Sequence, residues 1–426
     1  MSATAPRTRI SAGLILLLSA LTAIGPLTFD TYLAAFPQIA RDLSATPATV
    51  QLTLTASLAG LAVGQVLIGS LSDTFGRRRP LLGGLMVYVV TSAALIFADS
   101  TGLFTALRFV QGFAAAAGMV LSMAILRDSF EGIAVSKAMA RLMLVVGVAP
   151  VLAPTLGAQL LRFGSWRMIF AFLTVAGLLL LTLAWVRLRE TLPVERRRTG
   201  GTAAALRTYR DLLADRGFLG LALLAATYMA ALFTYVAGST FVFQDGFGLD
   251  PQQFGYVFAS GAVAITIASQ VYGALVGRFR PEQILTVAVA AGVVLVGTLF
   301  VVARAGGGLV PVTVLLVLTL STAGLVMPSA PAIALDANPH RAGSAAALLG
   351  ALQFGAGAVV APATGLIGGS PAVGMATVMA AMILIAAVLL LAVSRGWRRD
   401  ATARTALALA EARTAHSSVP GSVPAP

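Results

Sequence analysis

The sequence predicts an all-α membrane protein in which twelve transmembrane helices form two pseudo-symmetric bundles of six helices. Three observations support this fold class: an apolar composition, regularly spaced apolar stretches and an internal repeat. Of the 426 residues, 58% are hydrophobic and 11% are charged, whereas a soluble domain has about 25% charged residues. The chain has no cysteine and two histidines, His340 and His416, so we expect neither disulfides nor a Cys/His metal site.

The formal net charge of +13 raises the question of nucleic-acid binding. Such binding uses a basic face on a soluble domain, whereas these arginines lie in short gaps between apolar stretches. We therefore expect no nucleic-acid partner.

Twelve apolar stretches are each long enough to cross about 30 Å of hydrocarbon as a helix. They lie at residues 11–34, 49–71, 81–98, 102–126, 137–161, 166–186, 217–241, 251–277, 284–303, 309–335, 343–368 and 373–393. We predict an N-terminal bundle at 1–186, a cytoplasmic linker at 187–216, a C-terminal bundle at 217–394 and a disordered cytoplasmic tail at 395–426. The linker carries eight arginines and is interpreted as solvated, with one short surface helix.

The first apolar stretch has two interpretations. Arg7 and Arg9 precede an apolar run at 10–27, which is the pattern of a cleaved signal peptide. Cleavage would leave eleven spans and place Asp30 at a new N-terminus. We expect a retained helix instead.

Cations are concentrated on every second connection between spans. If the N-terminus is inside, the outer segments contain only Arg41, Arg162, Arg167 and Arg304. The inner segments contain all the other cations of the chain except Arg108, including Lys137 and Arg141 at the inner end of the fifth span. The positive-inside rule then predicts that both termini are cytoplasmic in a multi-pass protein of the bacterial cytoplasmic membrane.

An internal repeat relates the two sets of spans. A shift of 208 positions places the segment APTLG, which begins at Ala153, on the segment APATG, which begins at Ala361. The same shift superposes Asp128 on Asp336 and agrees with the span numbers, which indicates duplication. Two duplicated bundles imply a substrate site at their interface near the middle of the membrane, opened to each side in turn.

Several motifs resemble those of a known family. The stretch GSLSDTFGRR, from Gly69 to Arg78, resembles the signature loop of the major facilitator superfamily. The stretch from Arg108 to Gln111, together with Arg127 and Asp128, is similar to the fourth-span signature of its proton-coupled members.

Two further motifs are more specific. The segment from Gly147 to Gly157, which includes Pro150 and Pro154, is similar to the fifth-span signature of the antiporters. The segment DTYLAAFP, which begins at Asp30, resembles the first-span motif of the Bcr/CflA branch, the drug:proton antiporters of bicyclomycin and chloramphenicol resistance. Ala34 stands where that branch usually has proline.

The resemblance implies the major facilitator fold and a latch in the cytoplasmic turn. Its members would be Gly69, Asp73, Gly76 and Arg77, with Asp128 as a further partner, and it would favour the outward-open state. In physical terms, Asp73 can face the positive end of a helix that begins near Gly343. That contact would join the bundles only while the cytoplasmic side is closed. The alternative is a solvated turn whose charges only set the topology.

Asp30 is the only acid that falls inside a predicted span, and Arg108 is the only cation at comparable depth. A carboxylate within a membrane is costly and suggests a function. We predict that the two residues face each other and couple protons to transport: protonation of Asp30 and binding of substrate would compete. The alternative is a static buried ion pair.

Other candidate residues surround this pair. Gln111 lies one helical turn from Arg108 and would hydrogen-bond the substrate or hold the arginine. The candidate walls of a substrate pocket are Tyr32, Phe36, Tyr228, Phe233 and Tyr235, each of which has lipid exposure or packing as its alternative role. The Pro/Gly motif of the fifth span permits close helix approach and bending, with plain packing as the alternative.

The leading functional hypothesis is a proton-driven exporter of small lipophilic or amphipathic compounds, of the phenicol or bicyclomycin kind by resemblance. A proton-coupled symporter for a small nutrient is the alternative, although the spans contain few polar side chains for such a substrate. We expect no enzyme activity, no cofactor and no metal. The expected partners are the substrate, protons and the lipid bilayer, and we expect a monomer.

Overall fold

The helices begin and end where the local sequence can satisfy the backbone. The structure, a computed structural model, describes residues 12–130, 133–197, 201–367 and 369–417. Thr46 accepts a hydrogen bond from the N–H of Thr49 and precedes Pro47 at the first turn of a helix, and Asp250 forms a capping box with Gln253. Such caps satisfy backbone groups that have no partner within the helix.

The first unit contains six long helices. They are α1 (Ala12–Asp30), α3 (Pro47–Phe75), α4 (Arg78–Ile96), α5 (Thr101–Ser129), α6 (Ile133–Leu160) and α7 (Arg167–Arg187). Two short elements, η1 (Leu33–Ala35) and α2 (Phe36–Asp42), join α1 to α3. The linker contains η2 (Val194–Arg196) and α8 (Gly201–Ala214).

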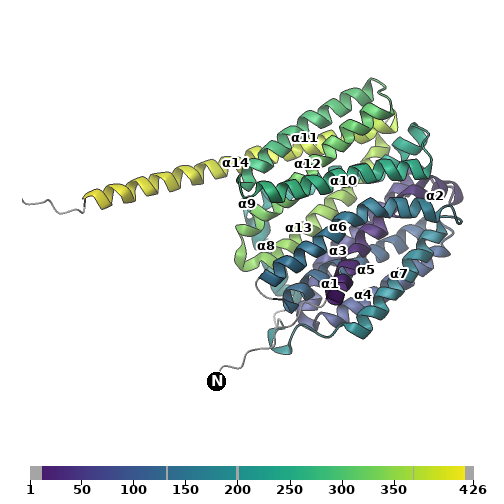
Figure 1. Ribbon diagram of the computed structural model, residues 1–426, viewed down its shortest axis with the longest axis horizontal. Coiled ribbons are helices and arrows are strands. Elements are labelled where there is room, and N and C mark those ends of the chain that lie inside the picture. Colours follow the sequence, from purple (N-terminus) through teal and green to yellow (C-terminus); the bar gives the residue numbers. More distant parts are fainter. Residues whose placement is uncertain (1–11, 131–132, 198–200, 368, 418–426) are drawn as a thin grey trace, which may run out of the picture.

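The second unit repeats this plan. Its long helices are α9 (Arg216–Thr240), α10 (Pro251–Leu275), α11 (Pro281–Arg304), α12 (Leu309–Asp336), α13 (Ala342–Val360) and α14 (Pro371–Ser417). The short elements η3 (Phe241–Gly246), η4 (Pro339–Arg341) and η5 (Ala361–Leu366) adjoin them. Figure 1 shows the two units one above the other, with their long helices running in similar directions.

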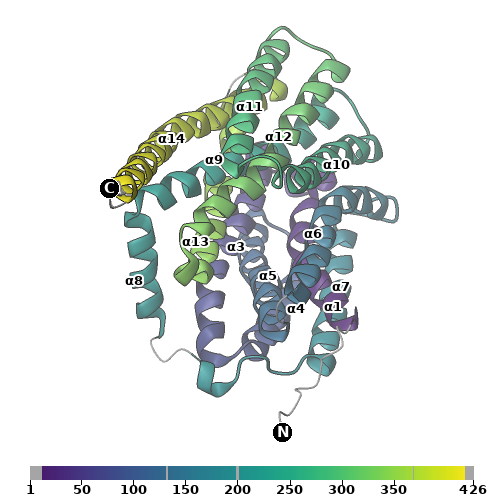
Figure 2. The same cartoon turned by 60° about the vertical axis from the view of Figure 1, so that its left-hand side comes forward.

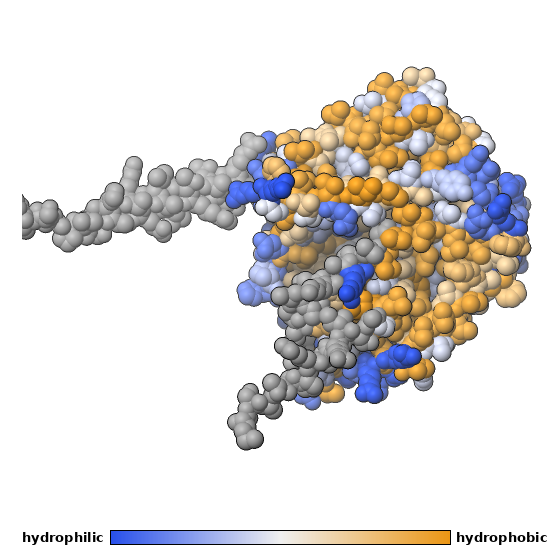
Figure 3. Space-filling model, in the orientation of Figure 1, coloured by the Kyte–Doolittle hydropathy of each residue, from blue (hydrophilic) through white to orange (hydrophobic). Residues whose placement is uncertain are grey.

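Within the described residues, eleven helical segments are long and apolar enough to cross a membrane. The remaining long helix is α6, whose described apolar part, Val148–Leu160, is shorter than the other eleven. Large apolar side chains such as Leu16, Val90 and Val301 are exposed on the outside of the molecule. Figure 3 shows hydrophobic residues over the middle of one face, with hydrophilic residues mainly toward its ends. The chain is therefore a multi-pass membrane protein.

The two units meet through two equivalent pairs of helices. Helix α3 packs against α13, and α6 packs against α10 (Figures 1 and 2). In span number these pairs are the second with the eleventh and the fifth with the eighth. The two-fold relation of the duplicated halves converts one pair into the other, which confirms the pseudo-symmetric architecture.

Two segments differ from the sequence-based expectation. The tail predicted to be disordered is helical as far as Ser417, because α14 continues beyond the bundle (Figure 1); its alanine-rich sequence has a high helix propensity. The predicted span at 343–368 divides at Val360, where α13 gives way to the 3-10 turn η5 beginning at Ala361. Residues 418–426 lie outside the described residues.

Candidate functional site

Asp30 is the last residue of α1 and lies close to the second unit. Only 7% of its surface is exposed, and in the described part of the chain no hydrogen bond or ion pair reaches its carboxylate. The carbonyl oxygens of Leu33 and Ala34, three and four residues further along the chain, accept hydrogen bonds from the second unit. The acid thus sits at the interface of the units without a cation beside it.

Arg108 on α5 is fully buried inside the first unit. Its guanidinium donates to the Oε1 atom of Gln111 and, at 3.2 Å, to the carbonyl oxygen of Thr28 on α1. Gln111 in turn donates to the Ser92 hydroxyl at 2.7 Å. Among the residues that the structure describes, none forms a hydrogen bond with the Nε atom of Arg108.

Aromatic rings complete the surroundings of this cation. The guanidinium carbon of Arg108 lies 4.1 Å from the ring centre of Tyr32 and 5.8 Å from that of Phe170. Tyr32 is also fixed by a 3.3 Å hydrogen bond between its hydroxyl and that of Thr53. Ring faces attract a buried cation, so the first unit holds the charge of Arg108 without a carboxylate.

The predicted pairing of Asp30 with Arg108 is wrong for this conformation. No ion pair among the described residues contains either of them. Arg108 contacts Thr28 and Tyr32, which stand four residues apart on one face of the chain at the end of α1. Asp30 is two residues from each, or about 200° around a helix, so its side chain leaves the opposite face. Asp30 and Arg108 lie at similar depths along their helices, but their side chains do not point toward each other.

Four of the predicted pocket residues lie inside one unit or the other. Tyr32 and Gln111 belong to the Arg108 network of the first unit. Tyr228 lies within the second unit, with its hydroxyl oxygen 3.4 Å from that of Thr322. Phe233 packs on Phe354 of α13.

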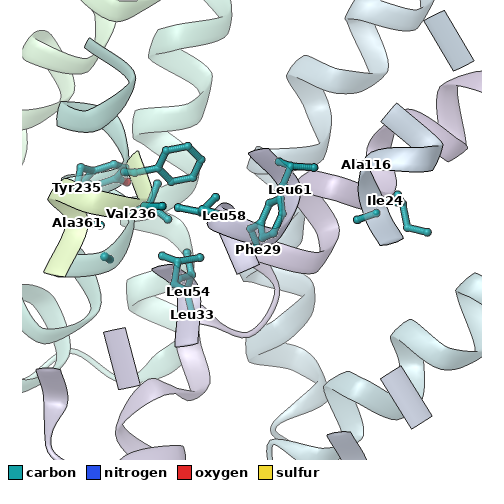
Figure 4. Close-up of a cluster of buried hydrophobic side chains, with 14 of the residues drawn as sticks. Ile24, Phe29, Leu33, Leu54, Leu58, Leu61, Ala116, Tyr235, Val236 and Ala361 are labelled. Carbon is teal, nitrogen blue, oxygen red and sulfur yellow. The ribbon is translucent and has the colours of Figure 1, made fainter. Parts of the chain in front are cut away.

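Two pocket candidates lie where the units meet. Phe36 packs on Phe241 of the second unit, with ring centres 6.0 Å apart. Tyr235 is stacked on Phe258 and donates to its carbonyl oxygen at 3.4 Å. Figure 4 shows Tyr235 and Val236 of α9 near Leu54 and Leu58 of α3. These rings and aliphatic side chains form an apolar region where the two units meet (Figure 4).

Five hydrogen bonds join the two units in the described part of the chain, and all lie at the end opposite α8, here called the far end. Thr240 donates to the carbonyl oxygen of Leu33 at 3.2 Å, and Gln244 donates to that of Ala34 at 3.3 Å. Gln252 donates to the carbonyl oxygen of Ala158 at 3.1 Å.

Gln51 makes the other two far-end bonds. It donates to the carbonyl oxygen of Ala237 at 3.4 Å and accepts from the hydroxyl of Thr364 at 3.1 Å. No comparable bond between the described residues joins the two bundles at the end where α8 lies, here called the linker end. The units are therefore held together at the far end.

The predicted latch residues lie together at the linker end. Helix α3 ends at Gly76, whose φ of 91° favours glycine. Arg77 donates to Asp73 at 2.6 Å and to Asp128 at 3.0 Å. Burial opposes the charged form of Arg77, but these two carboxylates outweigh it and raise the pKa of its guanidinium. All three charges belong to the first unit, and Gly69 lies two turns earlier on α3.

The fifth-span motif lies where α6 meets α1. A Cβ atom at Gly157 would collide with the carbonyl oxygen of Thr31, next to Asp30. Pro150 and Pro154 lie within the helix. Gly147 is also on α6, in a part whose side chains are outside the described residues. The glycine thus permits the close approach of α6 to the end of α1.

Some residues at these sites were missed from the sequence. The far-end glutamines Gln51, Gln244 and Gln252 resemble any polar residue near a span end, so no motif marks them. Glu190, which binds the latch turn, lies in a linker interpreted as solvated. For Glu190, the available signal was an acid at the end of one span and the N-terminus of another helix, α4, that lacks a capping side chain. The sequence does not say which helix ends meet.

The family model described as Major Facilitator Superfamily matches residues 18–362. The chain belongs to the Major Facilitator Superfamily. Among curated members of this superfamily, an "uncharacterized MFS-type transporter YdgK" of Bacillus subtilis is 39% identical over 355 residues, which are 83% of this chain and 88% of that protein. The chain is accordingly a transporter.

Other members carry functional names. A "bicyclomycin resistance protein homolog" of Haemophilus influenzae is 34% identical over 81% of this chain and 87% of that protein. The "multidrug resistance protein MdtL" of Escherichia coli O157:H7 is 28% identical over 62% of this chain and 67% of that protein.

Solved structures of the superfamily share the fold. A bacterial homologue of the human lysosomal transporter Spinster has a TM-score of 0.70 at 16% identity, covering 90% of this chain and 96% of that chain. The human organic anion transporter MFSD10 has a TM-score of 0.67 at 21% identity, covering 90% of this chain and all of the other. These likenesses support the two-bundle architecture.

Proposed function

We propose that this protein is a proton-coupled exporter of small lipophilic or amphipathic antibiotics, such as phenicol-like or bicyclomycin-like compounds, and that it works by alternating access. The observation that carries the proposal is Asp30: a buried acid with no ion pair among the described residues, in a chain of two symmetric units whose described hydrogen bonds to each other lie at the far end. The names of the Haemophilus and Escherichia relatives support the drug class.

Asp30 supplies the coupling in this proposal. An ionised carboxylate at such a site is costly unless a proton or another group neutralises its charge. A proton and a substrate would therefore compete for the space beside it, and the proton gradient would drive the exchange. Arg108 would contribute a fixed positive charge to the first unit, where Gln111 and Tyr32 hold its guanidinium.

The pocket in this proposal lies at the interface, with Phe36 and Tyr235 in its wall and with Phe233 and Tyr228 behind it in the second unit. The apolar surroundings suit a lipophilic substrate. Both units and the contacts between them arise within one chain, which supports a monomer as the working unit.

The distribution of arginines supports a cytoplasmic location for the linker end and for both termini in a bacterial cytoplasmic membrane. On that orientation the five far-end bonds would close the outer side, which would correspond to an inward-facing state. In that state Asp73 would not contact α13. The latch would be complete only after the linker end closes, when Asp73 could reach the first turn of that helix.

The test is drug efflux from an efflux-deficient bacterium that expresses the protein, with chloramphenicol and bicyclomycin as substrates and with and without an uncoupler. Asp30→Asn should leave the protein in the membrane and reduce gradient-dependent efflux at least tenfold. Asp99→Asn, at an exposed acid of the far end, is the matched control and should retain activity. Unimpaired active efflux by Asp30→Asn would remove the coupling role, and drug uptake in place of efflux would favour a symporter.

A further inference from the structure

The last turn of α1, which carries Asp30, is bounded on both sides by interruptions of the regular helix. Pro26 lies within α1, and proline has no N–H to donate within a helix. After Asp30 the chain leaves the α-helix through a turn and then forms η1. The orientation of the segment 27–30 therefore depends on its contacts with neighbouring helices.

Thr28 lies within this segment and is bonded to two of those helices. Its carbonyl oxygen accepts from the Nη2 atom of Arg108 on α5 at 3.2 Å. The last carbonyl groups of a helix need an external donor, and a cation is favourable there. The hydroxyl oxygen of Thr28 lies 2.7 Å from the phenol oxygen of Tyr88 on α4. Thr28 thus joins α1 to both α4 and α5.

Tyr88 is the donor in the bond to Thr28. The Thr28 hydroxyl donates its single proton to the carbonyl oxygen of Ile24, at 2.5 Å, because a carbonyl group can only accept. The phenol must therefore donate to the Thr28 oxygen. Both side chains are fully buried, and a buried polar group that loses its partner is costly. The bond consequently favours one placement of the end of α1.

The ring of Tyr88 fits a space on α7. A Cβ atom at Gly177 would lie 2.9 Å from the Cδ1 atom of Tyr88, closer than such atoms approach without a shift. The absence of a side chain at Gly177 thus leaves room for the ring. Tyr88 is packed against α7 on one side and bonded to α1 on the other.

Helix α4 supports both arms of the Arg108 network. Ser92, one helical turn after Tyr88, accepts from Gln111 at 2.7 Å. Gln111 in turn accepts from the Nη1 atom of Arg108. On the other arm, Tyr88 donates to Thr28, whose carbonyl oxygen accepts from the Nη2 atom of Arg108. The two arms begin at neighbouring positions of α4, so this helix positions both the cation and the end of α1.

The position of Thr28 determines the direction of Asp30. Thr28 faces α4 and α5, and a residue two positions further along a helix points about 200° away. We infer that Tyr88 is a positioning residue of the coupling acid: by donating to Thr28, it holds the end of α1 in the orientation that directs Asp30 away from Arg108. The consequence for transport rests on the proposed coupling role of Asp30.

Infrared difference spectroscopy can measure the surroundings of Asp30 apart from transport. The full-length protein is reconstituted in lipid vesicles at acidic pH, and the carboxyl C=O stretching band of Asp30 is assigned as the band that Asp30→Asn lacks. The frequency of this band depends on the hydrogen bonds and charges around the carboxyl group. Tyr88→Phe removes the phenol hydroxyl and keeps the ring.

Thr91→Val is the matched control. Thr91 is also buried on α4, but its hydroxyl donates to carbonyl oxygens within that helix. The variant therefore removes a buried hydroxyl from the same helix without removing a bond to α1.

We expect Tyr88→Phe to shift the Asp30 band and to reduce gradient-driven efflux roughly twofold to tenfold, the ratio that one neutral hydrogen bond supports. Thr28→Val, which removes the acceptor, should give the same shift. The double variant should show no further loss, because both changes break one bond. Thr28→Ser keeps the hydroxyl and should resemble the wild type, and Thr91→Val should change neither the band nor efflux.

An unchanged band in both Tyr88→Phe and Thr28→Val would overturn the inference, as would additive losses in the double variant. If the wild-type protein exports drugs while the band stays unchanged, the role of Tyr88 is wrong and the proposed function stands. If the wild-type protein shows no gradient-dependent efflux, the proposed function is wrong, and the band still decides whether Tyr88 positions Asp30. Should Tyr88→Phe not fold, Thr28→Val and Thr28→Ser carry the test, and equal bands in these two variants overturn the inference.

Discussion

Asp30 and Arg108 are two buried charges that the first unit keeps apart. Arg108 has its own acceptors and rings, so its charge does not depend on Asp30. In the proposed function, Asp30 would consequently be available to a proton or a substrate.

Glu190, which accepts from the backbone N–H groups of Arg77, Arg78, Thr191 and Leu192, gives a prediction for the pH dependence of stability. Burial opposes the charge of its carboxyl, but these N–H groups outweigh it. Its pKa is lowered in the folded protein from an ordinary value of 4.5, so its contribution is fully present above that value and is lost as the pH falls through the folded pKa. Glu190→Gln should therefore melt at a lower temperature than the wild type at pH 7, and the difference should shrink below about pH 4.5.

Thermal unfolding in detergent, followed by circular dichroism at several pH values, measures this difference. Glu195→Gln, at an exposed acid of the same linker, should melt like the wild type throughout the range. A difference between wild type and Glu190→Gln that stayed constant down to pH 3 would assign the effect to shape and not to charge.

At the level of single residues, sequence reasoning found the charged groups but not their directions. Asp30 is conspicuous as the only acid within a predicted span, and Arg108 is the only cation at a comparable depth. Their pairing was inferred from depth, whereas the rotation of each side chain around its helix depends on tertiary packing. Glu190 was missed for a related reason: its partners are backbone N–H groups, which every sequence contains.

Among the elements, α1 and α6 make the closest contact near the acid. Gly157 faces the backbone oxygen of Thr31, which cannot move as a flexible side chain could. Gly157→Ala should therefore force the helices apart, with a destabilisation of about 1–3 kcal/mol and a loss of efflux, because the end of α1 carries Asp30.

Gly83→Ala is the matched control, because a Cβ atom at this α4 position would meet no atom within 4 Å. In a helix this control should be neutral or slightly stabilising. Thermal unfolding and efflux are measured for both variants. Equal stability and equal efflux for the two would show that α1 and α6 tolerate a wider separation than their contact suggests.

The existence of the long helices was predictable from hydropathy, and their ends agree within a few residues because caps and prolines mark them. Similar motifs nevertheless take different forms in the two halves. Pro154 lies inside α6, whereas the equivalent Pro362 lies in the 3-10 turn η5. Neighbouring elements decide whether a helix bends or breaks at proline, and a single sequence does not describe those neighbours.

For the whole molecule, the hydrogen bonds between the described parts of the two units lie at the far end. Each of these neutral bonds contributes about 0.5–1.5 kcal/mol. Replacing Gln244 and Gln252 by leucine together should favour opening of the far end by roughly 5- to 100-fold. Spin labels at Phe163→Cys and Arg304→Cys, both exposed at that end, measure the shift.

Gln159→Leu provides the control, because Gln159 bonds to Arg162 within the same unit. That variant should keep the wild-type distances. If the double leucine variant also kept them, apolar contacts such as that between Phe36 and Phe241 would be sufficient to hold the far end closed.

The architecture as a whole was the most predictable level. Duplication in the sequence implied two equivalent bundles, and the pairing of α3 with α13 and α6 with α10 follows from the symmetry. The conformation was not predictable, because it depends on which helix ends meet, and the sequence does not mark residues such as Gln51, Gln244 and Gln252 that bond the two units.

The far-end closure consists of amide, hydroxyl and carbonyl groups and contains no ion pair among its described bonds. Dissolved salt weakens attraction between exposed charges, over a Debye length of about 8 Å at physiological ionic strength, but it has little effect on neutral bonds. Hydrogen bonding between the units at the far end should thus remain equally strong as the ionic strength of the surroundings changes.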